Sequence, residues 1–195
     1  MAIKVTGGLY ESLMRQIAEI MRQIHQPGGY PFDPARLHQG LQRLIEGLMD
    51  SAASATYPIT VDYGLSVEAM VKAGRYDWVN DYITSRNFPT KKKGKKQVVV
   101  ELIHLNRSVS TDDALKELDK MGMRPAELHE LLALGQMYPE LQREFPVVAL
   151  GSVWQNPNGN RYVSYLSRDD SERNLYLDWF EVDWYGFFRF AAVRK

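Results

Sequence analysis

The order of the predicted elements between residues 98 and 195 constrains the fold of this chain more than any other feature. Residues 98–105 begin with three consecutive valines and continue with alternating apolar side chains, a pattern that is typical of a β-strand. Two helices follow this strand. Ser110 or Thr111 caps the first helix, with two aspartates in its first turn, where the helix dipole favours acids. Pro125 opens the second helix, so the segment begins as strand, helix, helix.

A run of strands completes this segment. Residues 145–154 are almost entirely apolar and are predicted to form a strand that is buried on both faces. The turn-forming run 156–160 separates this strand from further strands at 161–166, 175–180 and 187–193. We therefore expect an α+β fold, in which the strands form an antiparallel meander with both helices on one side of it.

Two amphipathic helices are predicted near the N-terminus. Apolar residues recur every three or four positions over residues 9–26, and the run 27–29 (Pro-Gly-Gly) ends that helix. Asp33 caps a second helix, whose apolar stripe reaches Leu48. We expect the two helices to pack as an antiparallel hairpin within residues 1–56, which offers a surface for a homodimer.

Residues 57–97 are expected to connect the helical hairpin with the α+β domain at 98–195. A short strand is predicted at 59–63, and Ser66 caps a brief helix that Gly74 ends. A basic loop completes the connecting region. The predicted plan is therefore a hairpin, a connecting region and a C-terminal domain.

The composition excludes several classes of function. The 195 residues include no cysteine, so disulfides, thiolate catalysis and cysteine-ligated metal centres are excluded. The 24 basic residues balance 24 acidic ones, so no overall charge favours nucleic acid or a membrane. There is no apolar run of about 18 residues, and the first residues do not resemble a signal peptide. We expect a cytoplasmic protein that does not associate with membranes.

The basic loop supports the alternative function. Five lysines surround Gly94, and each could act as a flexible point charge on a phosphate of a nucleic acid. These residues are Lys91, Lys92, Lys93, Lys95 and Lys96. The other interpretation is a mobile, solvated loop that keeps the following apolar strand soluble. The neutral charge of the rest of the chain favours the second interpretation.

Aromatic residues gather in the C-terminal strands and are the main candidates for ligand binding. Tyr and Trp combine apolar area with a polar tip, which suits sugars, peptides and protein surfaces. Because side chains alternate across a strand, only one set can lie on a binding face, and the others belong to the core. The candidate ligand-binding residues are Tyr162, Tyr176, Trp179, Trp184 and Tyr185.

No catalytic, metal or cofactor signature stands out. The acidic residues between positions 169 and 183 lack the spacing of a calcium loop. The histidines are dispersed, and only His129 has an adjacent carboxylate, on Glu130. We predict no catalytic residue, no metal site and no cofactor. An enzyme with scattered site residues stays open as a further alternative.

Two short segments carry a resemblance to a known family. Residues 122–127 (Gly-Met-Arg-Pro-Ala-Glu) lie where the second helix opens, and residues 188–194 (Phe-Arg-Phe-Ala-Ala-Val-Arg) end the chain's last strand. In these segments and in the order of its elements, the C-terminal half resembles the C-type-lectin-like fold, including its formylglycine-generating-enzyme branch. The copper-binding cysteines of that branch and the calcium-binding triplet of the lectins are absent here. The resemblance therefore implies a scaffold rather than an activity.

The whole chain also resembles a widespread set of uncharacterised bacterial proteins. The segments that carry this resemblance are residues 33–42, 45–47, 76–80 and 148–154. This resemblance implies only that the helical hairpin, the connecting region and the C-terminal domain occur together. The function we expect is that of a non-catalytic recognition module, which binds a protein or a small ligand through an aromatic face of the C-terminal meander.

Overall fold

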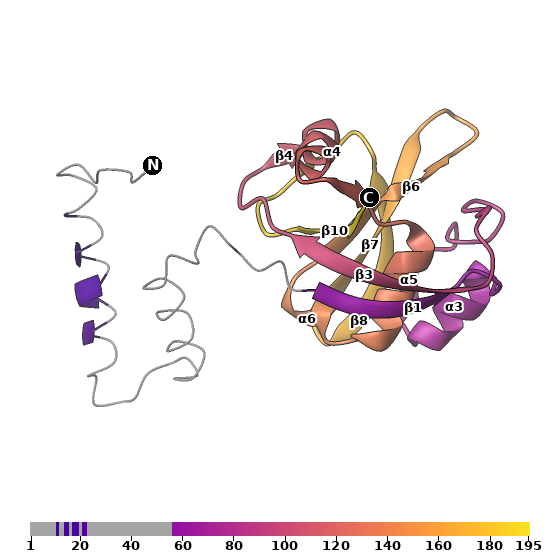
Figure 1. Ribbon diagram of the computed structural model, residues 1–195, viewed down its shortest axis with the longest axis horizontal. Helices are drawn as coiled ribbons and strands as arrows, with labels where there is room; N and C mark the ends of the chain where they lie inside the picture. Colours follow the sequence, from indigo (N-terminus) through magenta and orange to yellow (C-terminus); the bar gives the residue numbers. More distant parts are fainter. Residues whose placement is uncertain (1–10, 12–13, 16, 20, 23–55) are drawn as a thin grey trace. The chain divides into compact units, whose positions relative to one another are not determined.

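The computed structural model of the chain describes residues 11, 14, 15, 17–19, 21, 22 and 56–195 (Figure 1). Two compact units are distinguished, Met1–Ala52 and Ala53–Lys195. The described residues of the first unit are helical, as expected for the helix predicted at 9–26. The second predicted helix, the hairpin and its use in a homodimer lie outside the described residues and stay predictions.

The second unit contains both helices and strands. In chain order they are β1 (Thr56–Asp62), α3 (Val67–Gly74), β2 (Trp78–Val79), β3 (Lys95–Ile103), β4 (Val109–Ser110), α4 (Thr111–Lys120), β5 (Met123–Pro125), α5 (Leu128–Met137), α6 (Leu141–Glu144), β6 (Val147–Gln155), β7 (Arg161–Asp169), β8 (Glu172–Trp179), β9 (Asp183–Trp184) and β10 (Arg189–Arg194). This unit thus combines helices with strands, in agreement with the α+β prediction.

One eight-stranded sheet organises the unit, in the order β1-β3-β10-β6-β7-β8-β2, with β5 added to β10. β6, β7 and β8 form the predicted antiparallel meander. The prediction is wrong for the last strand, because β10 lies between β3 and β6, antiparallel to the first and parallel to the second. A parallel neighbour requires a long connection rather than a tight turn. Here the segment between β8 and β10 leads back to the middle of the sheet, and it includes β9, which pairs with β4.

The central strands are buried on both faces. Along β6, Val147 and Ala149 enter one apolar core, whereas Val148 and Leu150 enter the other. This confirms the two-sided burial predicted for the strand at its first half, while residues 151–155 alternate between exposed and half-buried. Since successive side chains of a strand point to opposite faces, such a strand needs a covering layer on each side.

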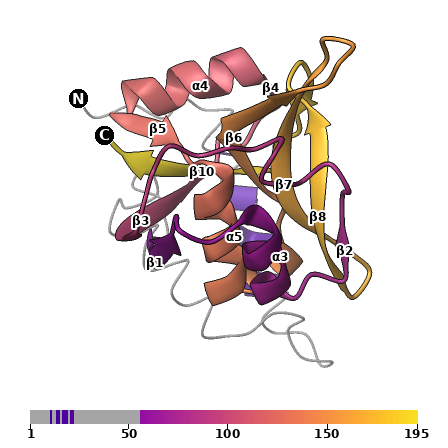
Figure 2. The same ribbon diagram turned by 90° about the vertical axis from the view of Figure 1, so that its right-hand side faces the viewer.

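Helices α4 and α5 cover the sheet from opposite sides. Ala114 and Leu118 of α4 pack in the core that contains Val148, whereas Leu131 and Leu132 of α5 pack in the other. Figure 2 shows α5 at the centre of the unit, with α3 beside it and α4 at a distance. The prediction that both helices lie on one side is therefore wrong. Each helix has an apolar stripe, but a stripe does not specify which face of a sheet it meets.

Helix α5 is enclosed by the rest of the unit. Every residue from Leu128 to Gly135 is buried. A Cβ atom at Gly135 would collide with the Tyr76 hydroxyl, so glycine allows the close approach here. Pro125 does not open this helix, in contrast to the prediction. It belongs to β5, because the chain stays extended beside β10 until the N-cap residue Glu127.

The segment predicted as a connecting region is part of the same unit as residues 98–195. β1 pairs with β3 along its whole length, so β3 begins at Lys95 rather than at Val98. The side chain of Ser66 caps α3, as predicted, by accepting a hydrogen bond of 3.1 Å from the amide of Ala69. The residue with left-handed backbone at the end of α3 is Arg75, with φ 50°.

A buried arginine joins the C-terminal ends of two helices. Arg173 of β8 donates hydrogen bonds of 2.8 Å to the carbonyl oxygens of Gly74, in α3, and Gly135, in α5. It also donates to the carbonyl of Pro139 and to the side chain of Gln142, each at 3.1 Å. The last carbonyls of a helix have no partner within the helix, and the negative end of its dipole attracts cations. Arg173 therefore satisfies acceptors that would otherwise be buried without a donor.

We expect Arg173→Met to lower the free energy of unfolding by about 3 kcal/mol or more, because buried carbonyls lose their donor. Denaturant titration measures this change. Arg168 is the matched control, since it is the cross-strand neighbour of Arg173 on β7 but is exposed. Arg168→Met should change the stability by less than about 0.5 kcal/mol. Equal effects of the two substitutions would contradict the role of Arg173.

Candidate functional site

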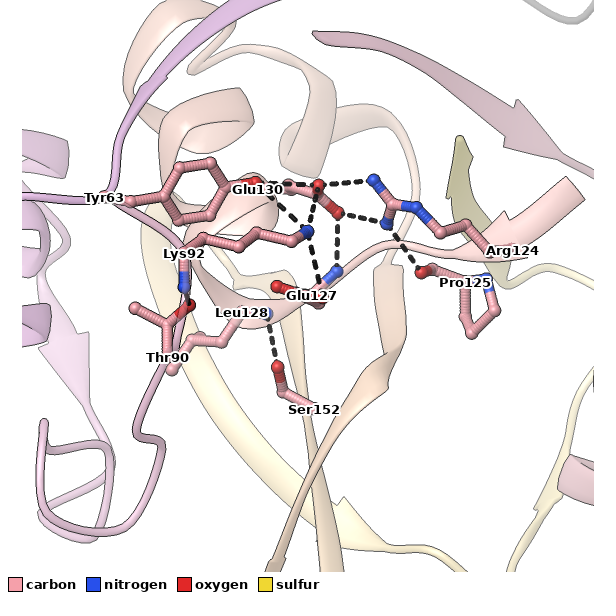
Figure 3. Close-up of polar contacts among 9 residues, drawn as sticks. All are labelled: Tyr63, Thr90, Lys92, Arg124, Pro125, Glu127, Leu128, Glu130 and Ser152. Atoms are coloured by element: carbon pink, nitrogen blue, oxygen red, sulfur yellow. Dashed lines mark hydrogen bonds and ion pairs between the residues drawn. The ribbon is translucent and has the colours of Figure 1, made fainter. Parts of the chain in front are cut away.

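A fully buried carboxylate lies at the start of α5. Glu130 is the third residue of the helix, and its relative exposure is 0%. Arg124 holds it with two hydrogen bonds, of 2.9 Å from Nη1 to Oε2 and 2.7 Å from Nη2 to Oε1 (Figure 3). Two parallel bonds between guanidinium and carboxylate fix the orientation of both groups.

Lys92 and Tyr63 complete this cluster from other parts of the chain. The hydroxyl of Tyr63 donates to Glu130 Oε1 at 2.9 Å. The Lys92 ammonium lies 3.4 Å from the same oxygen and 3.0 Å from Glu127 Oε1. It also lies 5.1 Å from the centre of the Tyr63 ring, within range of a cation–π interaction. Two cations thus balance two carboxylates, which is what buried charges require.

The cluster changes the acidity of its members. Burial by itself would raise the pKa of Glu130, but the hydrogen bonds from Arg124 and from the Glu127 amide, with the charges of Arg124 and Lys92, outweigh it. The pKa of Glu130 is therefore lowered to about 2. Burial and the neighbouring carboxylate of Glu130 raise the pKa of Tyr63. Glu130 is ionised and Tyr63 is protonated at neutral pH, as the hydrogen bond between them requires.

The same residues satisfy the backbone at the start of α5. The Glu127 amide donates to Glu130 Oε2 at 2.8 Å, and the Leu128 amide donates to Ser152 Oγ at 3.0 Å (Figure 3). These amides have no acceptor within the helix. Glu130 therefore acts first as a structural residue, which fixes the N-terminal end of a buried helix.

A cavity of about 470 Å³ adjoins this cluster. Residues 87–92 line it together with Glu127, His129 and residues 151–153 of β6. His129 is one of the lining residues although it is only 4% exposed, and the centroid of its ring lies 5.8 Å from that of Tyr63. Burial lowers the pKa of His129, so its imidazole is neutral at pH 7. We name this space the histidine cavity.

A second cavity of about 360 Å³ is lined by aromatic and amide side chains. Three rings form a continuous group: Tyr82 stacks on Trp154 with centroids 4.9 Å apart, and the centroid of Tyr162 lies 5.3 Å from that of Trp154. Leu177 adds an apolar contact surface. We name this space the aromatic cavity.

Amide groups border the aromatic cavity. Asn156 holds its turn together, since its Oδ1 accepts hydrogen bonds from the amides of Asn158 and Asn160 at 3.0 and 2.9 Å. The side chain of Asn158 forms no hydrogen bond with any described residue, and it lines the cavity. The lining also includes Asn80 and carries no charged side chain. These groups can hydrogen-bond a neutral ligand that lies on the rings.

The structure disperses the five aromatic residues that the sequence suggested as a ligand site. Only Tyr162 lines the aromatic cavity. The ring centroids of Tyr176 and Trp78 lie 5.0 Å apart. Trp179 is 57% exposed. Tyr185 is 65% exposed and stacks on Phe187.

Trp184 lies in the core. It is 1% exposed, and its indole N–H donates to Thr111 Oγ1 at 2.8 Å. This residue cannot contact a ligand at the surface. Its place in the interior follows from the pairing of β9 with β4, which no local pattern indicated.

Sequence reasoning missed Tyr82 and Trp154 as functional residues. The sequence around Tyr82 has no clear periodicity, and the apolar run that ends at Trp154 predicts a buried strand. The signal that could have pointed to this place is the turn 156–160 directly after Trp154, since a turn positions polar groups beside a strand end.

The lysine loop is less uniform than predicted. Lys95 and Lys96 belong to β3, and Lys95 lies 3.8 Å from Asp62. Lys92 is held by two carboxylates. Lys91 and Lys93 have no ion pair with any described residue. Nucleic-acid binding through this loop stays a prediction, with fewer free charges than the sequence indicated.

The described residues contain no cluster of three or more His, Asp or Glu side chains that could hold a metal ion. Of the acidic group near the C-terminus, Glu181 pairs with Arg161 at 2.7 Å. His104 contacts the carbonyl of Gly186 at 2.7 Å. Among the described helices, none is long and apolar enough to cross a membrane.

No protein-family model, no curated protein and no solved structure matches the chain. The resemblance to C-type-lectin-like domains is therefore an expectation from the sequence alone.

We expect the stability of the protein to fall in acid because of Glu130. Its pKa of about 2 in the folded protein lies below the ordinary value of 4.5, so its contribution to stability is complete above pH 4.5 and is lost as the pH falls to about 2. This loss amounts to about 3 kcal/mol. Denaturant titrations between pH 7 and pH 2 measure it.

Glu130→Gln should remove this part of the acid dependence. It should also lower the stability at pH 7 by about 3–5 kcal/mol, because Arg124 and Lys92 lose a buried partner. The control is Glu140→Gln, since Glu140 is exposed and pairs with Arg143 at the surface. Identical acid profiles for the wild type and Glu130→Gln would refute the assigned role.

Proposed function

We propose that this protein is a non-catalytic recognition module, whose ligand lies in the aromatic cavity. The observation that carries this proposal is the group of three rings, Tyr82, Trp154 and Tyr162, along a cavity bordered by amide groups. Such rings offer large apolar faces at low entropic cost, and the amides offer both donors and acceptors. The side chains of this cavity suit binding rather than bond cleavage, because no titratable acid or base lines it other than the two tyrosines.

The side chains that line the aromatic cavity favour one class of ligand. A charged ligand would lose hydration without gaining an ion pair, because no charged side chain lines the cavity. A ligand with a flat apolar face can lie along the group of rings, and hydroxyl or amide groups at its edge can pair with Asn158 and Asn80. Neutral saccharides have this combination of an apolar ring face and a polar edge. They are therefore the first probes of the site.

The proposal extends to the finer description of the fold. We propose that residues 98–195 follow a C-type-lectin-like arrangement, with the helical hairpin of residues 1–56 as an additional part. The antiparallel pairing of β10 with β3 supports this arrangement, since it joins the two ends of the segment. This second proposal concerns the scaffold only. The proposal for the ligand site rests on the aromatic cavity alone.

Asn158→Ala should weaken the binding of a neutral saccharide at least about fivefold, because the ligand loses a hydrogen-bond partner worth about 1 kcal/mol. Binding to a panel of mono- and disaccharides can be followed by the fluorescence of Trp154, with calorimetry for the positive cases. Asn158 is exposed and its side chain has no partner among the described residues, so this substitution should leave the fold intact.

Asn160→Ala is the matched control, since Asn160 is exposed in the same turn but does not line the cavity. It should leave the affinity unchanged. A second control is Trp179→Ala, which removes an exposed tryptophan outside the cavity. If Trp179→Ala abolished binding and Asn158→Ala did not, the ligand would lie elsewhere and the proposal would be wrong.

A further inference from the structure

The histidine cavity is separate from the aromatic cavity and differs from it in chemistry. The two spaces share no lining residue. The aromatic cavity carries no charged side chain, whereas Lys91, Lys92 and Glu127 line the histidine cavity. A ligand of the histidine cavity must therefore belong to another class, and its binding does not depend on the proposed function.

His129 is the second residue of α5 and lines the histidine cavity. It is 4% exposed, and its imidazole forms no hydrogen bond with any described residue, although its ring lies against that of Tyr63. The ring nitrogens of His129 are not among the fully buried side-chain atoms that lack a partner. Because His129 lines the cavity, a group placed there can supply a hydrogen-bond partner that the described residues do not.

Several hydrogen-bond donors border this cavity. The cavity lies at the N-terminal end of α5, where the helix dipole favours negative charge. The Glu127 and Leu128 amides are taken by Glu130 and Ser152, whereas the amide of His129 donates to no described residue outside the helix. Lys91 adds an ammonium group that has no ion pair with the described residues. The neutral imidazole can donate one further hydrogen bond.

Glu127 is the one carboxylate among the described residues that line the cavity, and it takes part in the capping box of α5. Its side chain is 28% exposed and contacts the Lys92 ammonium at 3.0 Å. Glu130 holds the same ammonium from the buried side, at 3.4 Å. Lys92 would therefore stay in place if Glu127 turned outward, and its side facing the cavity would then be free for another anion.

We propose that the histidine cavity binds a small oxyanion, a phosphate or carboxylate group, which takes the place of Glu127 beside Lys92. The anion is held by Lys91 and Lys92, by the His129 side chain and by the start of α5. Charge-assisted hydrogen bonds of this kind are about twice as strong as neutral ones. Glu127 competes with the ligand for Lys92, so the empty site keeps its charges balanced.

Titration of the full-length protein with inorganic phosphate tests this site, with the His129 ring resonances in the NMR spectrum as the readout. Lys91→Met should weaken phosphate binding about fivefold. The matched control is Lys93→Met, because Lys93 belongs to the same loop but does not line the cavity. Equal weakening by both substitutions would show a nonspecific basic loop and overturn the proposal. A parallel titration with acetate distinguishes a carboxylate from a phosphate site.

Glu127→Gln gives a test of opposite sign. Removal of the competing carboxylate should tighten phosphate binding about threefold or more, whereas a site for a cation or a zwitterion would lose its ligand. Weaker binding in Glu127→Gln, or unchanged His129 resonances in wild-type protein at saturating phosphate, would overturn the proposal. Asn158→Ala should leave phosphate binding unchanged, so failure here is distinguishable from failure of the saccharide site.

Discussion

A helix enclosed on nearly all sides must have both of its ends satisfied inside the protein, and this requirement governs the structure. The first amides and the last carbonyls of a helix have no partner within the helix, and water does not reach them when the helix is buried. In α5 the amides at the start are taken by Glu130 and Ser152. At the other end Arg173 donates to the carbonyl of Gly135. The partners come from segments far apart in the sequence, so the capping of one helix ties the unit together.

The charged groups around α5 are consequences of this requirement. Once the Glu130 carboxylate is buried, it needs cations, and Arg124 and Lys92 provide them from β5 and from the loop before β3. Buried ion pairs of this kind contribute little net stability compared with apolar packing, but removal of one member is costly. The Arg173 guanidinium forms no ion pair with any described residue and is satisfied by oxygen atoms of the backbone and of Gln142. These charged groups therefore serve first to stabilise the scaffold around α5.

Both cavities arise where the loop of residues 80–92 passes β6. Asn80 and Tyr82 meet Trp154 at one cavity, whereas residues 87–92 meet Ser152 at the other. The position of Lys92 is fixed by its ion pairs, which anchors this end of the loop against α5. A binding surface made by a loop on a rigid sheet is common among recognition proteins. Here the same surface offers a neutral aromatic space and a charged one.

The sequence by itself determined the elements that depend on local chemistry. Ser66 and Ser110 accept hydrogen bonds at the starts of their helices. The apolar run of β6 is buried on both faces where it begins, and β6, β7 and β8 form a meander. These features could be predicted because caps, periodicity and turns act over a few residues. Only the tertiary structure decided that β10 lies beside β6, that Pro125 extends a strand and that Trp184 is buried. It also decided that Lys92 binds Glu130 and that Tyr82 meets Trp154. Such contacts join segments that are distant in the sequence. Periodicity predicts that a side chain is buried, but it does not indicate which residues that side chain packs against.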